Sequence, residues 1–94
     1  MKIIWTPLGS RDRDDVYDFI EAENPSAAIT MDASVEKQLL HLALHPKLGR
    51  PGRVAGTREL VIHPRYMIIY DIEADHIRIL RLLHTARQWP PRKS

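Results

Sequence analysis

The 94-residue chain contains no cysteine, so it can form neither a disulfide framework nor a thiolate metal site. It also lacks any apolar run approaching the ~20 residues that a membrane-spanning helix needs. The opening segment Met1–Trp5 is too short for the apolar core of a signal peptide. We therefore expect a cytoplasmic protein without a membrane partner.

The sequence motifs of several enzyme classes are missing as well. There is no phosphate-binding GxxxxGK[ST], no GxGxxG and no HExxH, and we expect neither a cofactor nor a resident metal. The glycine-rich stretch 50–56 leads into a strand, so it lacks the helix N-terminus on which phosphate loops depend. His41 and His45 stand four residues apart on a predicted helix, a spacing that can bind a metal. No acid or third histidine lies near them in sequence, which favours exposed side chains.

Acidic residues are scarce in the second half of the chain. Residues 1–46 hold four Lys/Arg and eight Asp/Glu, a net charge of −4, whereas residues 47–94 hold ten and four, a net charge of +6. Such asymmetry favours an anionic partner on the basic side. The alternative is that acidic helices pack beside a basic sheet and neutralise it within one globule.

The first half reads as a strand followed by two helices. Residues 2–6 are apolar and stop at Pro7, and Ser10 is a suitable N-cap for a helix with Asp12, Asp14 and Asp15 in its first turn. Asn24-Pro25 ends that helix and opens a second, which ends at His45-Pro46. Apolar residues repeat at helical spacing. The predicted buried positions are Val16, Phe19, Ile20, Ala28, Met31, Val35, Leu39 and Leu42, with Leu40 and Leu44 widening the face.

The second half reads as a basic loop and three strands. Residues 47–56 form the loop, and strands follow at about 58–63, 66–72 and 76–83, joined by tight turns, which predicts an antiparallel meander with the last strand inside the sheet. The fold class is α+β, with order β-α-α-β-β-β and an antiparallel sheet packed on a helical hairpin. Residues 1–94 make one domain, with 85–94 as a flexible basic tail.

Histidines and arginines are the candidates for chemistry. His84 follows Leu82-Leu83 at a strand end, where a rigidly held imidazole can act as general acid or base, or can be a structural residue. His63 and His76 fit turn or surface positions. Arginine binds phosphate bidentately and keeps its charge. The candidate target-binding or nucleic-acid-binding residues are Arg50, Arg53, Arg58, His63, Arg65 and Arg87.

Taken together, these segments resemble the RelE/ParE superfamily of bacterial toxins. The specific parts are HPKLGRPGR at 45–53, RELV at 58–61, YMIIY at 66–70 and IRILRLLH at 77–84. The resemblance covers nearly the whole chain. It implies the toxin of a type II toxin–antitoxin system, with growth arrest or plasmid stabilisation as the outcome and a cognate antitoxin protein as partner.

The superfamily divides by target, and the resemblance bears on that division. RelE-like members cleave mRNA in the ribosome, and two of that branch's basic positions fall here on Arg58 and Arg87. Three further positions of the branch fall on Leu60, Met67 and Lys93, which depart from its pattern. Loss of a transition-state cation costs about 10²–10³ in rate. ParE-like members, which poison DNA gyrase, resemble this chain in an aliphatic near Met67 and an arginine near Arg58.

The resemblance therefore favours a ParE-like gyrase inhibitor, which is not an enzyme. The runner-up is an endoribonuclease acting on mRNA at the 70S ribosome through catalytic Arg58, His84 and Arg87. A third possibility is a non-catalytic module that binds nucleic acid through its arginines. Arg58 and Arg87 are expected to be exposed, so that alanine at either position relieves toxicity without unfolding the domain.

Overall fold

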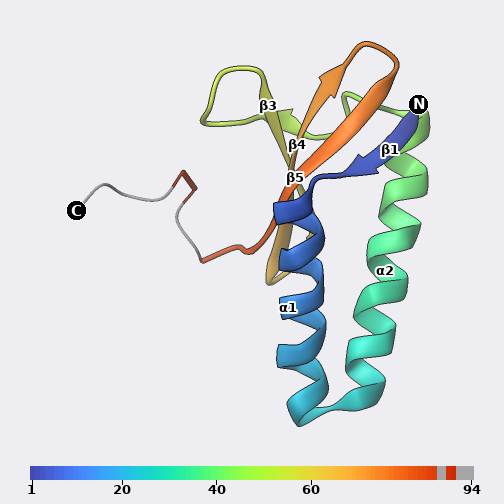
Figure 1. Ribbon diagram of the computed structural model, residues 1–94, viewed down its shortest axis with the longest axis vertical. Helices are drawn as coiled ribbons and strands as arrows, with labels where there is room; N and C mark the ends of the chain where they lie inside the picture. The colour runs from blue at the N-terminus through green and yellow to red at the C-terminus, as the bar shows by residue number, and fades with distance from the viewer. Residues whose placement is uncertain (87–88, 91–94) are drawn as a thin grey trace.

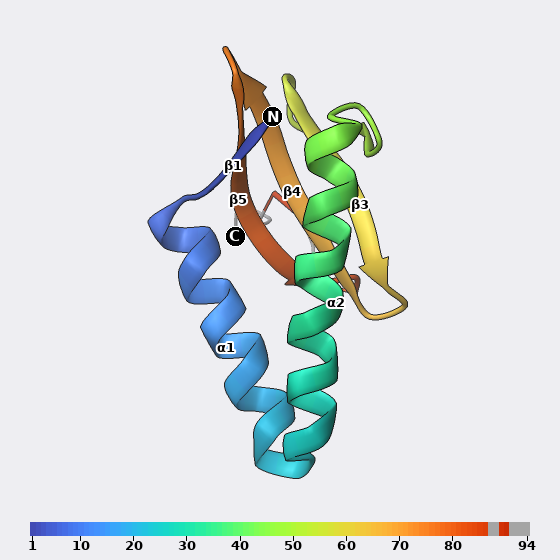
Figure 2. The same cartoon turned by 90° about the vertical axis from the view of Figure 1, so that its right-hand side faces the viewer.

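The computed structural model describes residues 1–86 and 89–90, and it folds into a sheet with two helices on one face (Figure 1). The strand order in the sheet is β1-β5-β4-β3-β2. Turned by 90°, the molecule shows the helical hairpin as a separate layer that runs past the end of the sheet (Figure 2). The elements are β1 Lys2–Trp5, α1 Pro7–Glu23, α2 Pro25–Leu44, β2 Arg50–Pro51, β3 Thr57–His63, β4 Tyr66–Glu73 and β5 His76–His84.

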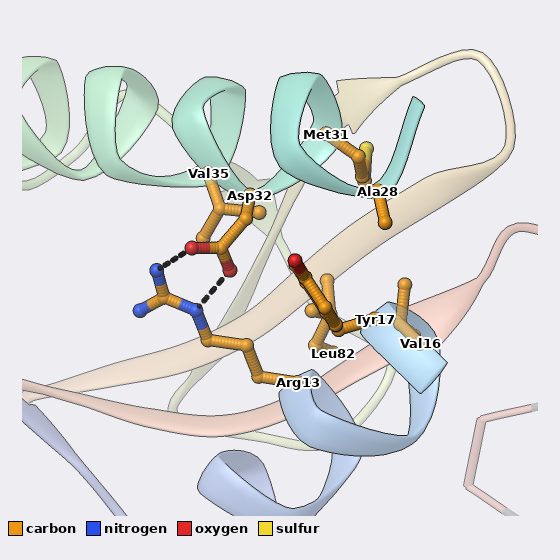
Figure 3. A pocket seen from close by; sticks show the side chains of 8 residues that line it. All are labelled: Arg13, Val16, Tyr17, Ala28, Met31, Asp32, Val35 and Leu82. Atoms are coloured by element: carbon orange, nitrogen blue, oxygen red, sulfur yellow. Dashed lines mark hydrogen bonds and ion pairs between the residues drawn. The ribbon is translucent and has the colours of Figure 1, made fainter. Parts of the chain in front are cut away.

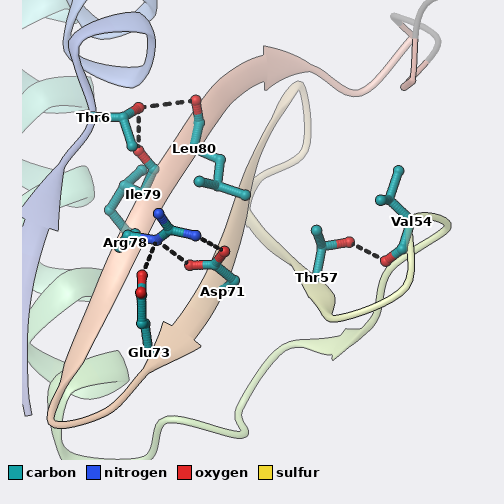
Figure 4. Close-up of polar contacts among 8 residues, drawn as sticks. All are labelled: Thr6, Val54, Thr57, Asp71, Glu73, Arg78, Ile79 and Leu80. Carbon is teal, nitrogen blue, oxygen red and sulfur yellow. Dashed lines mark hydrogen bonds and ion pairs between the residues drawn. The ribbon is translucent and has the colours of Figure 1, made fainter.

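Helix α1 begins earlier than the sequence predicts. Thr6 is its N-cap and accepts a hydrogen bond from the Gly9 amide at 3.0 Å, so the predicted cap at Ser10 is wrong. Proline favours the first helical position because its missing N–H needs no partner there, and Pro7 occupies it. The Thr6 hydroxyl also donates to the Ile79 carbonyl at 2.9 Å, so a tertiary contact fixes the helix start (Figure 4). No acidic residue lies in the first turn of α1, contrary to the sequence prediction.

The second helix and the hairpin are confirmed. Asn24 ends α1 and caps α2, accepting a hydrogen bond from the Ala27 amide at 3.2 Å. The predicted inner face of α2 is buried throughout, whereas Leu40 and Leu44 are 68% and 75% exposed and do not widen it. Phe19 of α1 is also outside the core, with 70% of its surface exposed. Figure 3 shows how Arg13 of α1 reaches Asp32 of α2, with Nε–Oδ1 at 2.8 Å, and ties the hairpin together.

The α+β order and the antiparallel meander β3-β4-β5 are confirmed, and β5 lies inside the sheet between β1 and β4. The sheet as a whole is mixed, because β1 pairs parallel with β5. A parallel pair needs a long crossover rather than a tight turn, and the hairpin and the meander together provide it. Within the predicted loop, Arg50–Pro51 forms the short strand β2, which pairs with Glu59 and Arg58 of β3.

The apolar residues form a main core and a smaller cluster. The main core lies between the hairpin and the sheet and includes Val35, Leu42 and Tyr70. On the sheet face away from the helices, Met67, Ile69 and Leu83 are buried, and Leu80 and Trp89 pack against them. Trp89 belongs to the predicted tail, and Thr85 is also held, because its amide donates to the Arg65 carbonyl at 2.7 Å. The rest of that tail, residues 87–88 and 91–94, lies outside the described residues.

A buried ion pair joins α1 to β5. Arg81 donates to Asp12 through Nε at 2.7 Å and Nη2 at 3.1 Å, and the Leu82 amide donates to the same carboxylate at 3.0 Å. Asp12 therefore accepts hydrogen bonds at the point where the β4–β5 register shifts. Breaking one partner of such a pair leaves a buried charge uncompensated. In the part of the chain that the structure describes, no helix has the length and hydrophobicity to cross a membrane.

Candidate functional site

At one end of the sheet, the basic loop is fastened to the strands. The Tyr70 hydroxyl is fully buried, accepts from the Gly49 amide at 2.9 Å and donates to the Pro46 carbonyl at 2.7 Å. Burial raises the pKa of Tyr70 above its usual value, because the phenolate would lose its hydration. Arg58 Nη1 donates to the Gly49 carbonyl at 2.7 Å. We call residues 46–59 and Tyr70 the loop end of the sheet.

The other two arginines of the loop end, Arg50 and Arg53, also make contacts with an acid or a carbonyl. Glu59 is 4% exposed, accepts from Arg50 Nη2 at 3.1 Å and accepts from the Arg53 amide at 3.2 Å. The Arg50 side chain remains 65% exposed, so part of its charge faces solvent. Arg53 Nη1 donates to the Trp89 carbonyl at 3.4 Å. The loop end therefore presents Arg50 and Arg53 outward and turns Arg58 inward.

At the opposite end, three rings stand side by side on neighbouring strands. Tyr66 pairs with His63 on one side and with His84 on the other. The ring centroids lie 5.8 Å apart for His63–Tyr66 and 5.4 Å apart for Tyr66–His84. We call His63, Arg65, Tyr66 and His84 the rim of the sheet.

Both rim histidines are held in the same way. His63 Nδ1 accepts from the Arg65 amide at 3.0 Å, and His84 Nδ1 accepts from the Ala86 amide at 3.1 Å. An accepting Nδ1 places the proton of the neutral imidazole on Nε2. Both histidines are exposed. Each imidazole is thus fixed by the backbone and keeps one nitrogen for a ligand or a proton transfer.

Two hollows lie between the rim and helix α1. Their volumes are about 260 Å³ and 440 Å³, and both are lined by Phe19 and Tyr66. Asp15 and Glu23 line the helix side, and His63, Arg65 and His84 line the other. The exposed Phe19 therefore lies in a groove with acids on the helix side and two histidines and one arginine on the rim side. Its helical spacing from Val16 and Ile20 suggested core, so this groove had no signal in the sequence.

The structure divides the predicted site residues into two groups. Arg50, Arg53 and Arg58 lie at the loop end, and His63, Arg65 and His84 lie at the rim. Arg58 is level with Tyr70 of β4, whereas His84 is level with Tyr66. Four residues along a strand and two strand spacings across separate their Cα atoms by about 16 Å. Arg87 lies outside the described residues, so the predicted set Arg58, His84 and Arg87 is not seen together.

Several other expectations can be compared with the structure. Arg58 is half-buried and hydrogen-bonded, so the prediction that it is exposed is wrong. His41 and His45 are exposed, and the described residues contain no group of three or more potential metal ligands. His76 lies 3.4 Å from Asp75, as a surface contact.

The charge asymmetry is partly neutralised inside the protein. Arg81 of the sheet pairs with Asp12 of α1, which is the packing alternative that the sequence left open. Arg78 donates to Asp71 at 2.9 Å and 2.6 Å and also reaches Glu73 (Figure 4). The hydrogen bond to Asp71 raises the pKa of Arg78 above its usual value. The arginines left facing solvent are therefore fewer than the sequence suggests.

Comparisons with known proteins agree with the fold described above. The family described as "ParE toxin of type II toxin-antitoxin system, parDE" matches residues 3–89. "Putative toxin Y4kP" of Sinorhizobium fredii is 39% identical over 95% of this chain and 93% of its own length. "Toxin RelE2" of Caulobacter vibrioides is 33% identical, over 92% and 97%. The structure "Chromosomal ParDE TA system from P. aeruginosa" superposes with a TM-score of 0.78 at 25% identity, covering 89% of this chain and 95% of that one.

Proposed function

This chain belongs to the ParE toxin family of type II toxin–antitoxin systems, and from that premise we propose that it inhibits DNA gyrase. Its membership in the RelE/ParE superfamily of toxins leaves two targets, gyrase and ribosome-bound mRNA. The match to the ParE family over residues 3–89 supports gyrase. So does Met67, an aliphatic residue where the RNA-cleaving branch carries a cation.

The observation that carries this choice is the position of Arg58. An mRNA-cleaving site needs a cation about 3 Å from the phosphate charge that develops in the transition state. The Arg58 guanidinium instead donates to the Gly49 carbonyl at 2.7 Å, within the protein. The ladder register also separates the Cα atoms of Arg58 and His84 by about 16 Å. A binding role toward a protein target makes no such demand.

A cognate antitoxin is the second partner that we propose. The family is defined by two-protein systems, and the solved structure with 25% identity is of such a system. The exposed apolar side chains outside the core, including Phe19, Leu40 and Leu44, give a binding protein surface to cover. Antitoxin binding should therefore raise the melting temperature of this chain, because a ligand that binds only the folded state stabilises it.

The alternative is mRNA cleavage on the ribosome, and one observation favours it. His63 and His84 flank Tyr66, each with Nδ1 fixed by a backbone amide and Nε2 left for proton transfer. In that case His84 would move the proton of the attacking 2′-hydroxyl, and arginines would bind phosphate. The site would then be the rim, with Arg65 as its nearest described arginine.

A supercoiling assay with the purified, antitoxin-free protein tests the proposal. Relaxed plasmid and gyrase are incubated with the toxin, and supercoiled and cleaved DNA are quantified on gels. We expect loss of supercoiling together with accumulated cleaved DNA. The Leu83→Asp variant, which should not fold, is the matched negative control. No effect at large toxin excess, with mRNA cleaved on translating ribosomes in parallel, would establish the alternative.

The third possibility, a non-catalytic module that binds nucleic acid, can be distinguished from the two toxin mechanisms by the salt dependence of its binding. A module that binds nucleic acid through its arginines should lose affinity steeply with salt, by about one unit of log–log slope per phosphate contacted. It should also leave both gyrase and translation unaffected. Growth arrest of cells that express the protein would exclude the non-catalytic module.

A further inference from the structure

Trp89 covers the apolar cluster on the open face of the sheet. The cluster consists of Met67 and Ile69 of β4 with Leu83 of β5, and Leu80 and Trp89 pack against it. Met67, Ile69 and Leu83 are 7%, 0% and 2% exposed. In residues 1–86 and 89–90 no helix lies on this face, since α1 and α2 cover the other one (Figure 2). Trp89 therefore covers apolar side chains that a second layer of helices would cover in a larger protein.

Two arginines hold Trp89, and they do so differently. The Arg81 guanidinium lies 5.8 Å from the centroid of the indole, a cation–π contact. Arg81 is independently fixed by its two hydrogen bonds to Asp12, so it keeps its position whether or not Trp89 is there. Arg53 is exposed, and its Nη1 donates to the Trp89 carbonyl at 3.4 Å. The cation–π contact therefore rests on an arginine that is fixed by Asp12, whereas the hydrogen bond from Arg53 is long and weak.

The indole itself is incompletely satisfied in this position. Its Nε1 is buried and has no hydrogen-bond acceptor among residues 1–86 and 89–90. Buried tryptophans normally find an acceptor for this N–H, and leaving it unpaired opposes docking. In water the N–H regains a partner. Apolar packing favours the docked ring, and the unpaired N–H opposes it.

We propose that Trp89 is a releasable cover, that Arg53 is its latch, and that a phosphate-rich polyanion opens it. A phosphate oxygen forms shorter, charge-assisted and often bidentate hydrogen bonds with guanidinium, which the carbonyl at 3.4 Å does not match. Arg50 presents a second exposed guanidinium from the same loop. A polyanion that engages both arginines therefore takes Arg53 away from Trp89. The coupling is reciprocal: the factor by which the polyanion disfavours the docked state of Trp89 is also the factor by which the docked state weakens the affinity for the polyanion.

Tryptophan fluorescence tests the latch. The chain has two tryptophans, Trp5 and Trp89, so Trp5→Phe leaves Trp89 as the sole reporter. Acrylamide, a neutral quencher, measures its accessibility before and after addition of inorganic tripolyphosphate. We expect the quenching constant to rise at least twofold on binding. Sodium chloride at equal ionic strength should leave it unchanged. If Trp5→Phe does not fold, the difference between the unaltered chain and Trp89→Phe yields the same signal.

The variants that decide the test differ by one arginine. Arg53→Ala should be more quenchable without any anion and should not respond to tripolyphosphate. Arg11→Ala removes an exposed arginine from α1 and should behave as the parent. The latch is disproved if calorimetry finds no tripolyphosphate binding, or if binding leaves Trp89 quenching unchanged. Parent-like quenching of Arg53→Ala, or an equal response to sodium chloride, also disproves it. None of these results depends on whether gyrase is the target.

Discussion

The two ends of the sheet use polar side chains in opposite ways. At the loop end, two polar side chains bond inside the protein: Tyr70 bonds Pro46 and Gly49, and Arg58 bonds Gly49. At the rim, the imidazoles of His63 and His84 each keep an exposed nitrogen beside an open groove. The loop end is thus held by hydrogen bonds of inward-facing side chains, whereas the rim is held by the apolar side chains beneath it and by two exposed hydrogen bonds from the backbone.

This difference shows why the number of arginines in a segment does not predict where a binding surface lies. Arg58 resembles the family's functional arginine in sequence, yet its guanidinium fastens a loop. The histidines are less numerous but more available. We expect substitutions at the loop end to act on stability first, and substitutions of the exposed rim groups to act on function alone.

The largest effect should come from a charge placed under the rim. Leu83 is 2% exposed in one cluster with Met67 and Ile69, and Leu83→Asp puts a carboxylate there without a partner. Burial of an unpaired charge costs about 4 kcal/mol or more, a large part of the total stability of a small domain. We expect an unfolded or aggregated protein by circular dichroism.

A control on the same face sharpens this result. Val61 pairs with Met67 but is 52% exposed, and Val61→Asp should cost about 1 kcal/mol or less. A soluble, cooperatively folded Leu83→Asp would show that apolar packing does not hold the rim.

At the loop end, the next largest effect should come from Gly49. A methyl group there would lie 2.8 Å from the Tyr70 ring and 2.9 Å from the Glu59 carbonyl oxygen. The backbone neighbour cannot move aside, so Gly49→Ala should cost about 3 kcal/mol in urea unfolding. Gly56→Ala is the control, since nothing lies within 4 Å and only its φ of +83° opposes a side chain. That backbone strain amounts to about 1 kcal/mol. Equal losses in the two variants would mean that the loop is not clamped at Gly49.

Local patterns in the sequence were enough to predict most of the fold. Asn24-Pro25 separates the helices because both residues act on their own backbone, and the tight turns at 64–65 and 74–75 fix the meander in the same way. The helix start was not predictable, since Thr6 and Ser10 can both cap. The hydrogen bond from Thr6 to Ile79, 73 residues away, favours Thr6.

The candidate site was harder to predict because its contacts are not local. Asp12 and Arg81 are 69 residues apart, and no spacing rule links them. Arg58 has the sequence surroundings of an exposed cation, and only the approach of Gly49 turns it inward. His63 and His84 were singled out from their strand ends, but their common neighbour Tyr66 follows from the register of three strands.

A smaller effect, with a pH signature, is expected for Tyr70→Phe. The variant loses the hydrogen bonds to Gly49 and Pro46, which should cost about 1–2 kcal/mol at neutral pH. Because burial raises the pKa of Tyr70 in the folded state, its contribution is complete below the unfolded pKa of about 10 and is lost as the pH rises through the folded value. The stability gap between the two proteins should therefore narrow above about pH 10. A gap that stays constant in urea titrations to pH 11 would contradict a buried, neutral Tyr70.

The smallest effect on stability is expected at His84. Its ring is exposed and its Nδ1 accepts one backbone hydrogen bond, so His84→Gln should change the unfolding free energy by about 0.5 kcal/mol or less. If gyrase is the target, inhibition of supercoiling should be retained, because no proton transfer is then required of the imidazole. If the rim cleaves mRNA, cleavage on ribosomes should fall by about 10²–10⁴-fold with the fold intact. Loss of stability comparable to that of Tyr70→Phe would show instead that the rim histidine is structural, and the contrast between the two ends of the sheet would no longer hold.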